Sequence, residues 1–181
     1  MTDGDGLIAW VSGLVEFGSG WTDAVLLAEA YAAASDPARL AEVAALAAAL
    51  APSAERLAET LGQGAAFLKA VRAWPDAAPL LDQAAWPVAV GAACGLAGIP
   101  LPDALTATLH AFASNLVSVA LRAIPLGQTE GVRVLAAVEP VILATAARAA
   151  RSTLDDLGSA ALMSDIAALR HETLQPRLFL S

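Results

Sequence analysis

The sequence has few of the side chains on which metal and redox sites depend. It contains one cysteine, Cys94, and two histidines, His110 and His171, which lie far apart in the sequence. A single cysteine cannot form an internal disulfide, and a transition-metal site within one chain needs about three or four clustered N or S ligands. The sequence therefore predicts no internal disulfide, no metal site and no cofactor.

Positive charge is also scarce. The chain has 10 Lys and Arg residues against 18 Asp and Glu residues, a formal net charge of −8. Contacts to phosphates need clustered Lys and Arg, so this balance argues against nucleic acid as a partner. The single lysine, Lys69, lies in GQGAAFLKAV, which does not match the Gly-x-x-x-x-Gly-Lys-Ser/Thr pattern of a phosphate-binding loop. The chain is therefore not expected to be a P-loop NTPase.

Uninterrupted apolar runs are short as well. The longest, WPVAVGAACGLAGIPL, contains two prolines and three glycines and falls short of the roughly 20 apolar residues of a membrane span. The start, MTDGDGLIAW, carries acidic residues where a signal peptide carries positive charge. Together with the lone cysteine, these features predict a cytoplasmic protein with no membrane partner.

Hydrophobic residues nevertheless make up 57% of the chain, and charged residues only 15%. Alanine and leucine dominate, both are strong helix formers, and no alternation of period two is sustained. The sequence predicts an all-α fold, a single-domain helical bundle over residues 1–181. The expected helices cover residues 6–20, 21–35, 36–52, 53–75, 103–125, 129–152 and 164–172, with a Pro-rich connector at 74–87 and a small-residue segment at 88–98.

Caps and prolines mark the ends of these helices. Asp36, Ser53 and Thr129 are the expected N-caps, and Gly127 is placed in the preceding turn. Gly residues at 62 and 64 weaken the middle of the fourth helix. Pro140 lies inside a long helical segment and predicts a kink or a break there.

The helix over 103–125 has the clearest amphipathic pattern. Apolar residues recur at three- and four-residue steps, at Leu105, Leu109, Phe112, Leu116 and Val119. His110 lies at the edge of this stripe and is expected to be a partly buried structural histidine, and Cys94 a small buried hydrophobe. Ser114, Asn115 and Ser118 interrupt the helix, either as hydrogen-bonding groups in the core or as contacts in an interface.

No catalytic constellation is found. Asp155 and Asp156 are adjacent, so their side chains would diverge by about 100° on a helix and could not act as an acid/base pair. They are expected in a solvated loop. From the residues alone, the chain is interpreted as a helical interaction domain and not an enzyme.

Two long motifs carry a family resemblance. SNLVSVALRAIPLGQTEG and, further on, DDLGSAALMSDIAALRHETLQPRLFLS closely resemble the UreF family of urease accessory proteins, whose members carry a similar NLVSAAVRLIPLGQ stretch and a DIASMRHETQYSRLFRS-like ending. GSGWTDAVLLA and WPVAVGAACGLAGIPLPDAL stand in the expected order, so the resemblance covers nearly the whole chain.

The chain departs from the family pattern in two places. Family members usually begin with a further segment that carries a Pro-x-Gly-x-Phe/Tyr-Ser-type motif, so this chain resembles an N-terminally truncated form. The tail has Leu174, Gln175 and Pro176 where an aromatic residue is common, and Leu180 where an arginine is common. The tail is therefore expected to bind with altered affinity.

The resemblance implies a non-catalytic, all-α scaffold in the insertion of nickel into urease. Such proteins bind a second accessory protein, UreD (also called UreH), and the GTPase UreG. With them they engage apo-urease, and they tend to form homodimers. The competing function is a ligand-binding helical regulatory domain, which predicts a central pocket and needs a DNA-binding region that the sequence lacks.

The C-terminal residues 170–181 are interpreted as a mobile docking tail. Leu178 and Phe179 would supply buried anchors, and Arg170 and Arg177 bidentate charge contacts, the usual types of binding hot spot. The alternative is a tail that packs on its own bundle. The residues expected to bind partners are Arg170, His171, Glu172, Arg177, Leu178 and Phe179 in the tail, with Gly127 and Gln128 in the PLGQ turn.

Overall fold

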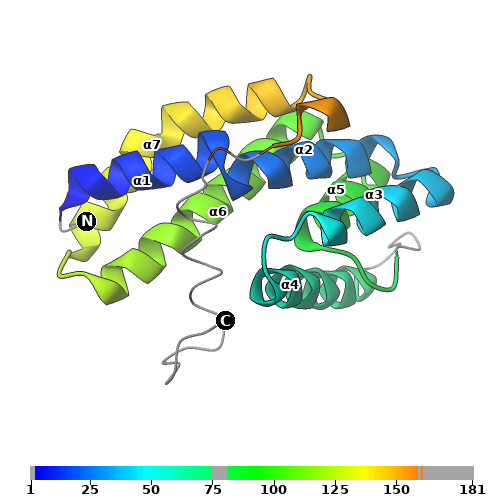
Figure 1. The fold of residues 1–181 in the computed structure, drawn as a ribbon, viewed down its shortest axis with the longest axis horizontal. Coiled ribbons are helices and arrows are strands. Elements are labelled where there is room, and N and C mark those ends of the chain that lie inside the picture. Colours follow the sequence, from blue (N-terminus) through cyan, green and yellow to red (C-terminus); the bar gives the residue numbers. More distant parts are fainter. Residues whose placement is uncertain (1–2, 75–80, 159, 161–181) are drawn as a thin grey trace. The chain divides into compact units, whose positions relative to one another are not determined.

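The computed structural model describes residues 3–74, 81–158 and 160 (Figure 1). These residues form helices and connecting turns, with no β-strand among them, which confirms the predicted all-α helical bundle. The helices are α1 (Gly4–Phe17), α2 (Ser19–Ala32), α3 (Pro37–Ala49), α4 (Ala54–Arg72), α5 (Trp86–Leu96), α6 (Leu101–Ala123), α7 (Gln128–Ala149) and the 3-10 helix η1 (Leu154–Asp156).

The described residues divide into two compact units. The first comprises residues 3–25 and 102–160, with α1, the beginning of α2, nearly all of α6, α7 and η1. The second comprises residues 26–101, with the rest of α2 and helices α3, α4 and α5. The predicted organisation, one domain over 1–181 with a tail at 170–181, stays a prediction because the tail lies outside the described residues.

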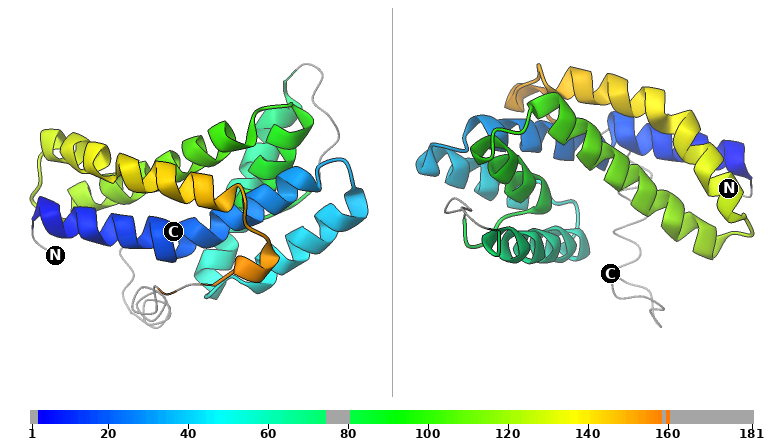
Figure 2. Two further views of the ribbon diagram at one scale, coloured as in Figure 1. Left: turned by 90° about the horizontal axis from the view of Figure 1, so that it is seen from above. Right: turned by 180° about the vertical axis from the view of Figure 1, so that it is seen from behind.

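In the first unit α1 packs lengthwise on α7 (Figure 2). The contact is apolar on both sides, and its central residues are at most 1% exposed: Leu7, Val11 and Val15 on α1, and Val134, Val138 and Ile142 on α7. Burying one such side chain stabilises a fold by about 1.5–3 kcal/mol. A hydrogen bond from Arg133 on α7 to Asp5 on α1, which are 128 positions apart in the sequence, also joins these two helices.

In the second unit glycines let backbones approach closely. Gly91 and Gly95 lie one turn apart on α5, and each faces a backbone carbonyl of α2, that of Leu27 and that of Tyr31. A Cβ atom added at Gly95 would lie 2.7 Å from the Tyr31 oxygen. The segment predicted only as small-residue sequence at 88–98 is therefore a helix whose glycines permit its packing.

The connector between α4 and α5 is held to α4 by its last residues. The hydroxyl oxygen of Thr60 accepts a hydrogen bond from the backbone N–H of Trp86, at 3.1 Å, and so caps the first turn of α5 from another helix. The Trp86 ring meets Phe67 edge to face, with centroids 5.3 Å apart. Gly64 faces the backbone carbonyl of Ala84, and its missing side chain permits this close approach. Helix α4 continues without interruption through both Gly62 and Gly64.

The caps are confirmed in part. The side chains of Asp36 and Ser53 accept from backbone N–H groups of the first turn, as predicted. The prediction for Thr129 is wrong, because α7 begins one residue earlier, at Gln128, with Gly127 as N-cap.

Pro140 does not break α7, which runs without interruption across it. Pro140 lies on the exposed face of the helix, and this face tolerates the missing backbone donor.

The burial of α6 differs from the predicted stripe. Leu105 and Leu109 are buried, but the buried line then continues through Ala113, Val117 and Ala120. Phe112 and Leu116 are only half-buried, and Val119 is 47% exposed. Small residues fill the contact with the neighbouring helices, so α6 leaves larger apolar side chains at the surface.

In the part of the chain that the structure describes, α6 is also the one helix long and apolar enough to cross a membrane by length and composition. A single helix of this kind is weak evidence for a membrane span, since the core helix of a soluble protein passes the same test.

Candidate partner-binding site

The PLGQ turn joins α6 to α7 and presents two of the predicted partner-binding residues to solvent. Gly127 and Gln128 are both exposed. The carbonyl oxygen of Gly127 accepts from the N–H groups of Glu130 and Gly131, at 3.1 and 3.2 Å, which fixes the start of α7. A Cβ atom added at Gly127 would meet nothing within 4 Å. The turn is thus ordered by its backbone and open on its outer side.

The N-terminus of α1 lies at the same end of the first unit as this turn (Figures 1 and 2), and an ion-pair network holds it there. Arg133 Nη2 lies 3.0 Å from the Asp5 carboxylate and 2.6 Å from that of Glu130. The hydrogen bond and charge of Glu130, followed by those of Asp5, raise the pKa of Arg133 above its ordinary value. Gly4 leaves the space that the Glu130 carboxylate occupies. The PLGQ turn therefore leads into the beginning of α7, which these ion pairs join to the beginning of α1.

The polar residues of α6 lie at the surface and not in the core. His110 is exposed, so its prediction as a partly buried histidine is wrong; its Nδ1 lies 3.3 Å from the Ser114 hydroxyl. Asn115 and Ser118 are exposed as well. These positions turn away from the buried line of α6, and a role in the core is excluded for Asn115 and Ser118.

Cys94, on α5, is half-buried and not fully buried as predicted, because it lies near the end of a helix whose last residues reach the surface. Partial burial raises the pKa of its thiol by desolvation. Asp155 and Asp156 are exposed in η1, as expected of a solvated segment, and the Asp156 carboxylate accepts from the backbone N–H of Thr153 at 2.9 Å.

The tail residues predicted to bind partners lie outside the described residues. These are Arg170, His171, Glu172, Arg177, Leu178 and Phe179. Their assignment stays a prediction, as does that of Gly127 and Gln128.

A second cluster in the first unit was not predicted from the sequence. The guanidinium of Arg148, in the last turn of α7, stacks on the ring of Trp21, 3.9 Å from its centroid. The Trp21 Nε1–H donates to the backbone oxygen of Asp156 at 3.0 Å, and the Trp21 side chain is buried. With Phe17, which is half-exposed, these residues line an open pocket of about 420 Å³.

Little in the sequence marks this cluster. Trp21 follows GSG, which would be noted as a helix break, and Arg148 stands in ARAARS beside another arginine. The two residues are 127 positions apart, in the first turn of α2 and the last turn of α7, and only long-range packing brings them together. An aromatic residue directly after a helix break was the one available signal.

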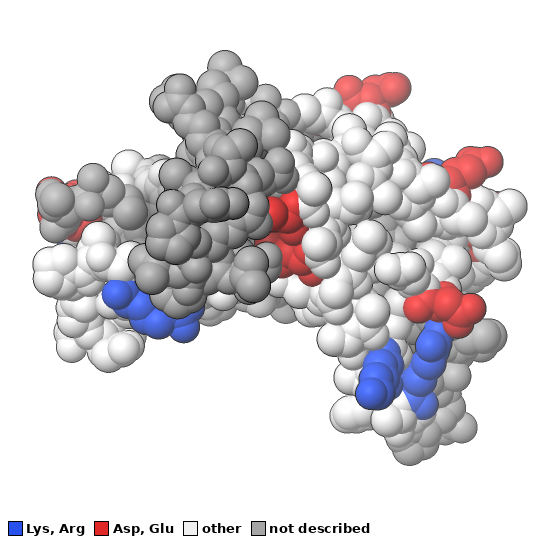
Figure 3. Space-filling view, turned by 60° about the horizontal axis from the view of Figure 1, so that its bottom comes forward, with Lys and Arg blue, Asp and Glu red and all other residues white. Residues whose placement is uncertain are grey.

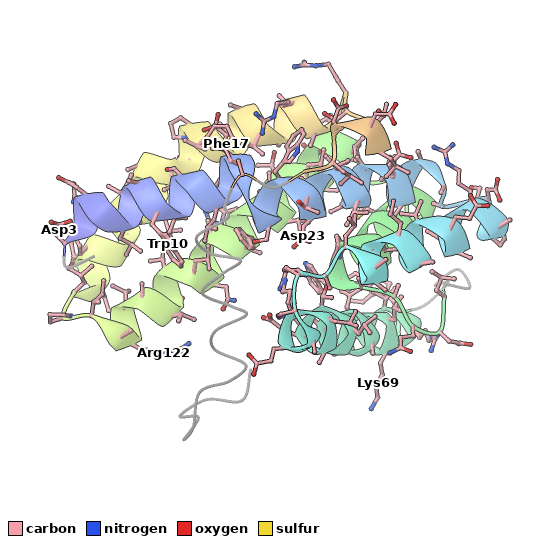
Figure 4. The ribbon with its side chains drawn as sticks, viewed as in Figure 1. Asp3, Trp10, Phe17, Asp23, Lys69 and Arg122 are labelled. Atoms are coloured by element: carbon pink, nitrogen blue, oxygen red, sulfur yellow. The ribbon has the colours of Figure 1, made fainter. Side chains whose placement is uncertain are left out.

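Charged side chains border both features: Arg133, Asp5 and Glu130 lie beside the turn, and Glu16, Arg148 and Asp156 line the pocket. On the face in Figure 3, charged side chains stand in separate small groups among uncharged residues. Figure 4 shows Trp10 and Phe17 projecting from α1, and these side chains are 40% and 49% exposed. Among the described residues no group of three or more His, Cys, Asp and Glu is placed to hold a metal ion.

Fold and surface together define a class: an all-α protein whose described surface carries exposed turns and apolar side chains and no metal-binding cluster. The model of the UreF family matches residues 1–139. The chain is 55% identical to the urease accessory protein UreF of Rhizobium leguminosarum bv. trifolii, over all of this chain and 82% of the relative. It is 53% identical to the UreF protein of Mesorhizobium japonicum, with the same coverage.

The chain therefore belongs to the UreF family of urease accessory proteins. This confirms the family resemblance and, because the family is by name an accessory and non-catalytic one, the prediction that the chain is not an enzyme. The matched range includes the PLGQ turn and ends before the tail. In Brucella ovis the UreF protein is 49% identical over the whole of this chain.

Proposed function

We propose that this chain is a scaffold in urease maturation, which binds a UreD/UreH-type accessory protein and the GTPase UreG and so promotes nickel insertion into apo-urease in the cytoplasm. The observation that carries the proposal is an exposed, backbone-fixed PLGQ turn in a chain that belongs to the UreF family. Nickel is the cargo of this process and not a resident cofactor of the chain.

Two regions would contact the accessory protein. The tail supplies Leu178 and Phe179 as apolar anchors, with Arg170 and Arg177 as charged contacts and His171 and Glu172 between them. The turn supplies Gly127, around which there is room for another backbone to approach, and the exposed Gln128. Large aromatic and arginine side chains carry most of the energy in protein interfaces.

The exposed side of α6 would join two copies of the chain. Asn115, Ser118 and Val119 lie there; Ser118 is small and Val119 apolar, and Asn115 can hydrogen-bond across a twofold axis. A Val119→Glu variant should keep its fold, since Val119 is 47% exposed, and should shift light scattering from dimer to monomer at tens of micromolar. A monomeric parent chain would contradict this part of the proposal.

The docking role of the tail is tested by measuring the affinity of three variants for the UreD/UreH-type protein. Phe179→Ala should weaken binding by about 2 kcal/mol, roughly 30-fold, because it removes a buried anchor. Arg177→Lys should weaken it because lysine cannot reproduce a planar bidentate contact. Ser181→Ala is the control and should bind as the parent chain does. Equal affinities for Phe179→Ala and Ser181→Ala would reject the assignment.

The competing function, a ligand-binding regulatory domain, requires a central pocket. The pocket that the described residues form beside Trp21 and Arg148 is open and lies where α1 ends, so this pocket does not meet that requirement. A thermal-shift screen of small molecules on the same protein separates the two functions, since a scaffold should give no stabilising ligand.

A further inference from the structure

The exposed face of α6 carries charge only at its two ends. Asp103 lies in the first turn of the helix and Arg122 in the last, and both are exposed. None of residues 104–121 is Asp, Glu, Lys or Arg, in a chain of net charge −8. Exposed residues between the two ends recur at three- and four-residue steps and so share one side of the helix: Ala107, His110, Ala111, Asn115 and Ser118. Depletion of charge is typical of the centre of a protein–protein interface.

Asp103 and Arg122 cannot pair with each other within one chain. They are 19 positions apart on one continuous helix, which separates them by about 28 Å. The ion pairs among the described residues include neither of them. Figure 4 shows Arg122 projecting from α6. Both charges are therefore available to a second molecule.

The face is self-complementary about its midpoint. When two copies of a helix pair antiparallel about a twofold axis, residues equally far from the midpoint on either side come to the same level. With the midpoint halfway between Asp103 and Arg122, each of these residues meets the other in the second copy. Ala107 comes to the level of Ser118. Small side chains on both helices at this level permit the helix axes to approach closely.

The same midpoint matches the remaining exposed positions. Ala111 comes to the level of Ser114, so small residues face each other on both sides of the twofold axis. His110 comes to the level of Asn115. An imidazole and an amide can each donate and accept a hydrogen bond, and both side chains are exposed in the single chain. Every level of the face thus holds two side chains that are compatible in size or chemistry.

We propose that two copies of the chain pair antiparallel along this face of α6, in the register that puts Asp103 of each copy beside Arg122 of the other. The twofold axis makes this ion pair occur twice, once at each end of the contact. A parallel pair would put like charges together at both ends, which charge complementarity opposes. The inference rests on the homodimer of the proposed function and deepens it, because it names the register and the residues that select it.

The helix dipole also favours an acidic residue in the first turn and a basic residue in the last. The two charges would therefore suit α6 in a monomer as well. The two explanations differ in what a second molecule can repair. The dipole acts within one chain, so a reversed charge stays unfavourable whatever is added, whereas an interface pair is restored by a partner that carries the opposite charge.

The test measures the dissociation constant of the dimer by sedimentation velocity at low ionic strength, where surface charges are least screened. Asp103→Arg and Arg122→Asp each put like charges at both ends of the contact and should weaken the dimer at least about tenfold. An equal mixture of the two variants should form a mixed dimer about as tightly as the parent chain does. In that dimer each end again holds one charge of each sign.

Glu139→Arg and Arg151→Asp are the matched controls, because they make the same charge changes at exposed positions outside α6. Both should dimerise as the parent chain does. The melting temperature of each variant is recorded as well, so that a loss of dimer is not confused with unfolding. If Asp103→Arg or Arg122→Asp does not fold, Asp103→Lys and Arg122→Glu replace them with the same expected outcomes.

Two results would overturn the register while leaving the homodimer intact. One is a dimeric parent chain whose single variants dimerise equally well. The other is a mixture of the two variants that dimerises no better than either variant alone. A parent chain that is monomeric would instead reject the homodimer of the proposed function, and the register with it.

Discussion

Arg148 and Trp21 form a stacked pair in the first unit, with the guanidinium carbon 3.9 Å from the centroid of the ring. The pair joins the beginning of α2, which carries Trp21, to the end of α7, and it lies beside the end of α1 and η1. The face of the Trp21 ring stacks on Arg148, and its indole N–H donates a hydrogen bond to Asp156 in η1. These two roles can be separated by substitution.

Trp21→Phe retains an aromatic face for Arg148 but removes the hydrogen bond to Asp156. It should lower the free energy of unfolding by about 1 kcal/mol, the usual net value of such a bond. Trp21→Ala, which also empties a buried site, should cost roughly 3–5 kcal/mol. Urea denaturation measures both. If the two variants were equally unstable, the indole hydrogen bond would be the main contribution and the stacking a minor one.

Gly62 and Gly64 offer a matched pair on α4. Gly64→Ala should destabilise the protein by about 1–3 kcal/mol, because the added Cβ atom would overlap the Ala84 carbonyl and force the backbone to shift. Gly62→Ala should stabilise it by about 0.5–1 kcal/mol, because nothing lies within 4 Å and alanine is the better helix former. Thermal unfolding should shift in opposite directions, and shifts of the same sign would contradict the packing of α4 on the connector.

The PLGQ turn should bind partners without contributing to stability. Gly127 has φ −82° and ψ 165°, which any residue adopts, and open space around it. Gly127→Leu and Gln128→Ala should therefore keep the melting temperature of the parent chain. Each should lose at least fivefold in affinity for the UreD/UreH-type protein, about 1 kcal/mol. Thr129→Ala, exposed next to them, is the control and should bind normally.

The thiol of Cys94 should make the stability of the fold depend on pH. Burial raises the pKa of its thiol, so the unfolded chain releases the thiol proton at lower pH than the folded one. The stability from this group is fully present below the ordinary thiol pKa of about 8.5 and is lost as pH rises through the higher folded value. The rate of iodoacetamide labelling should have its midpoint above that of a model thiol. A midpoint below it would show that Cys94 is activated.

Much of the helical pattern could be predicted from the sequence, because caps such as Asp36 and Ser53 and a composition rich in alanine and leucine act locally. The burial of α6 could not. Its apolar residues lie on two adjacent faces, and the face that packs uses small residues such as Ala113 and Ala120. Which face packs depends on the neighbouring helices, so Val119 and His110 were assigned to the wrong environment.

The site divides in the same way. The PLGQ turn could be located because glycine and proline mark turns, and its exposure was consistent with a binding role. The Arg148–Trp21 pair could not, since each residue alone has an unremarkable sequence context and their contact depends on long-range packing. The ion pair between Asp5 on α1 and Arg133 on α7 could not be predicted from local sequence either.

Deletion of residues 170–181 tests the central claim most directly. The packing of α1 on α7 and of α4 on α5 uses residues that precede that segment, so the shortened chain should keep its helical circular dichroism and a cooperative thermal transition. It should lose binding to the UreD/UreH-type protein and fail to activate urease with the other accessory proteins. A shortened chain that is folded and still activates urease would contradict the docking role, and one that is largely unfolded would make the tail a structural strap.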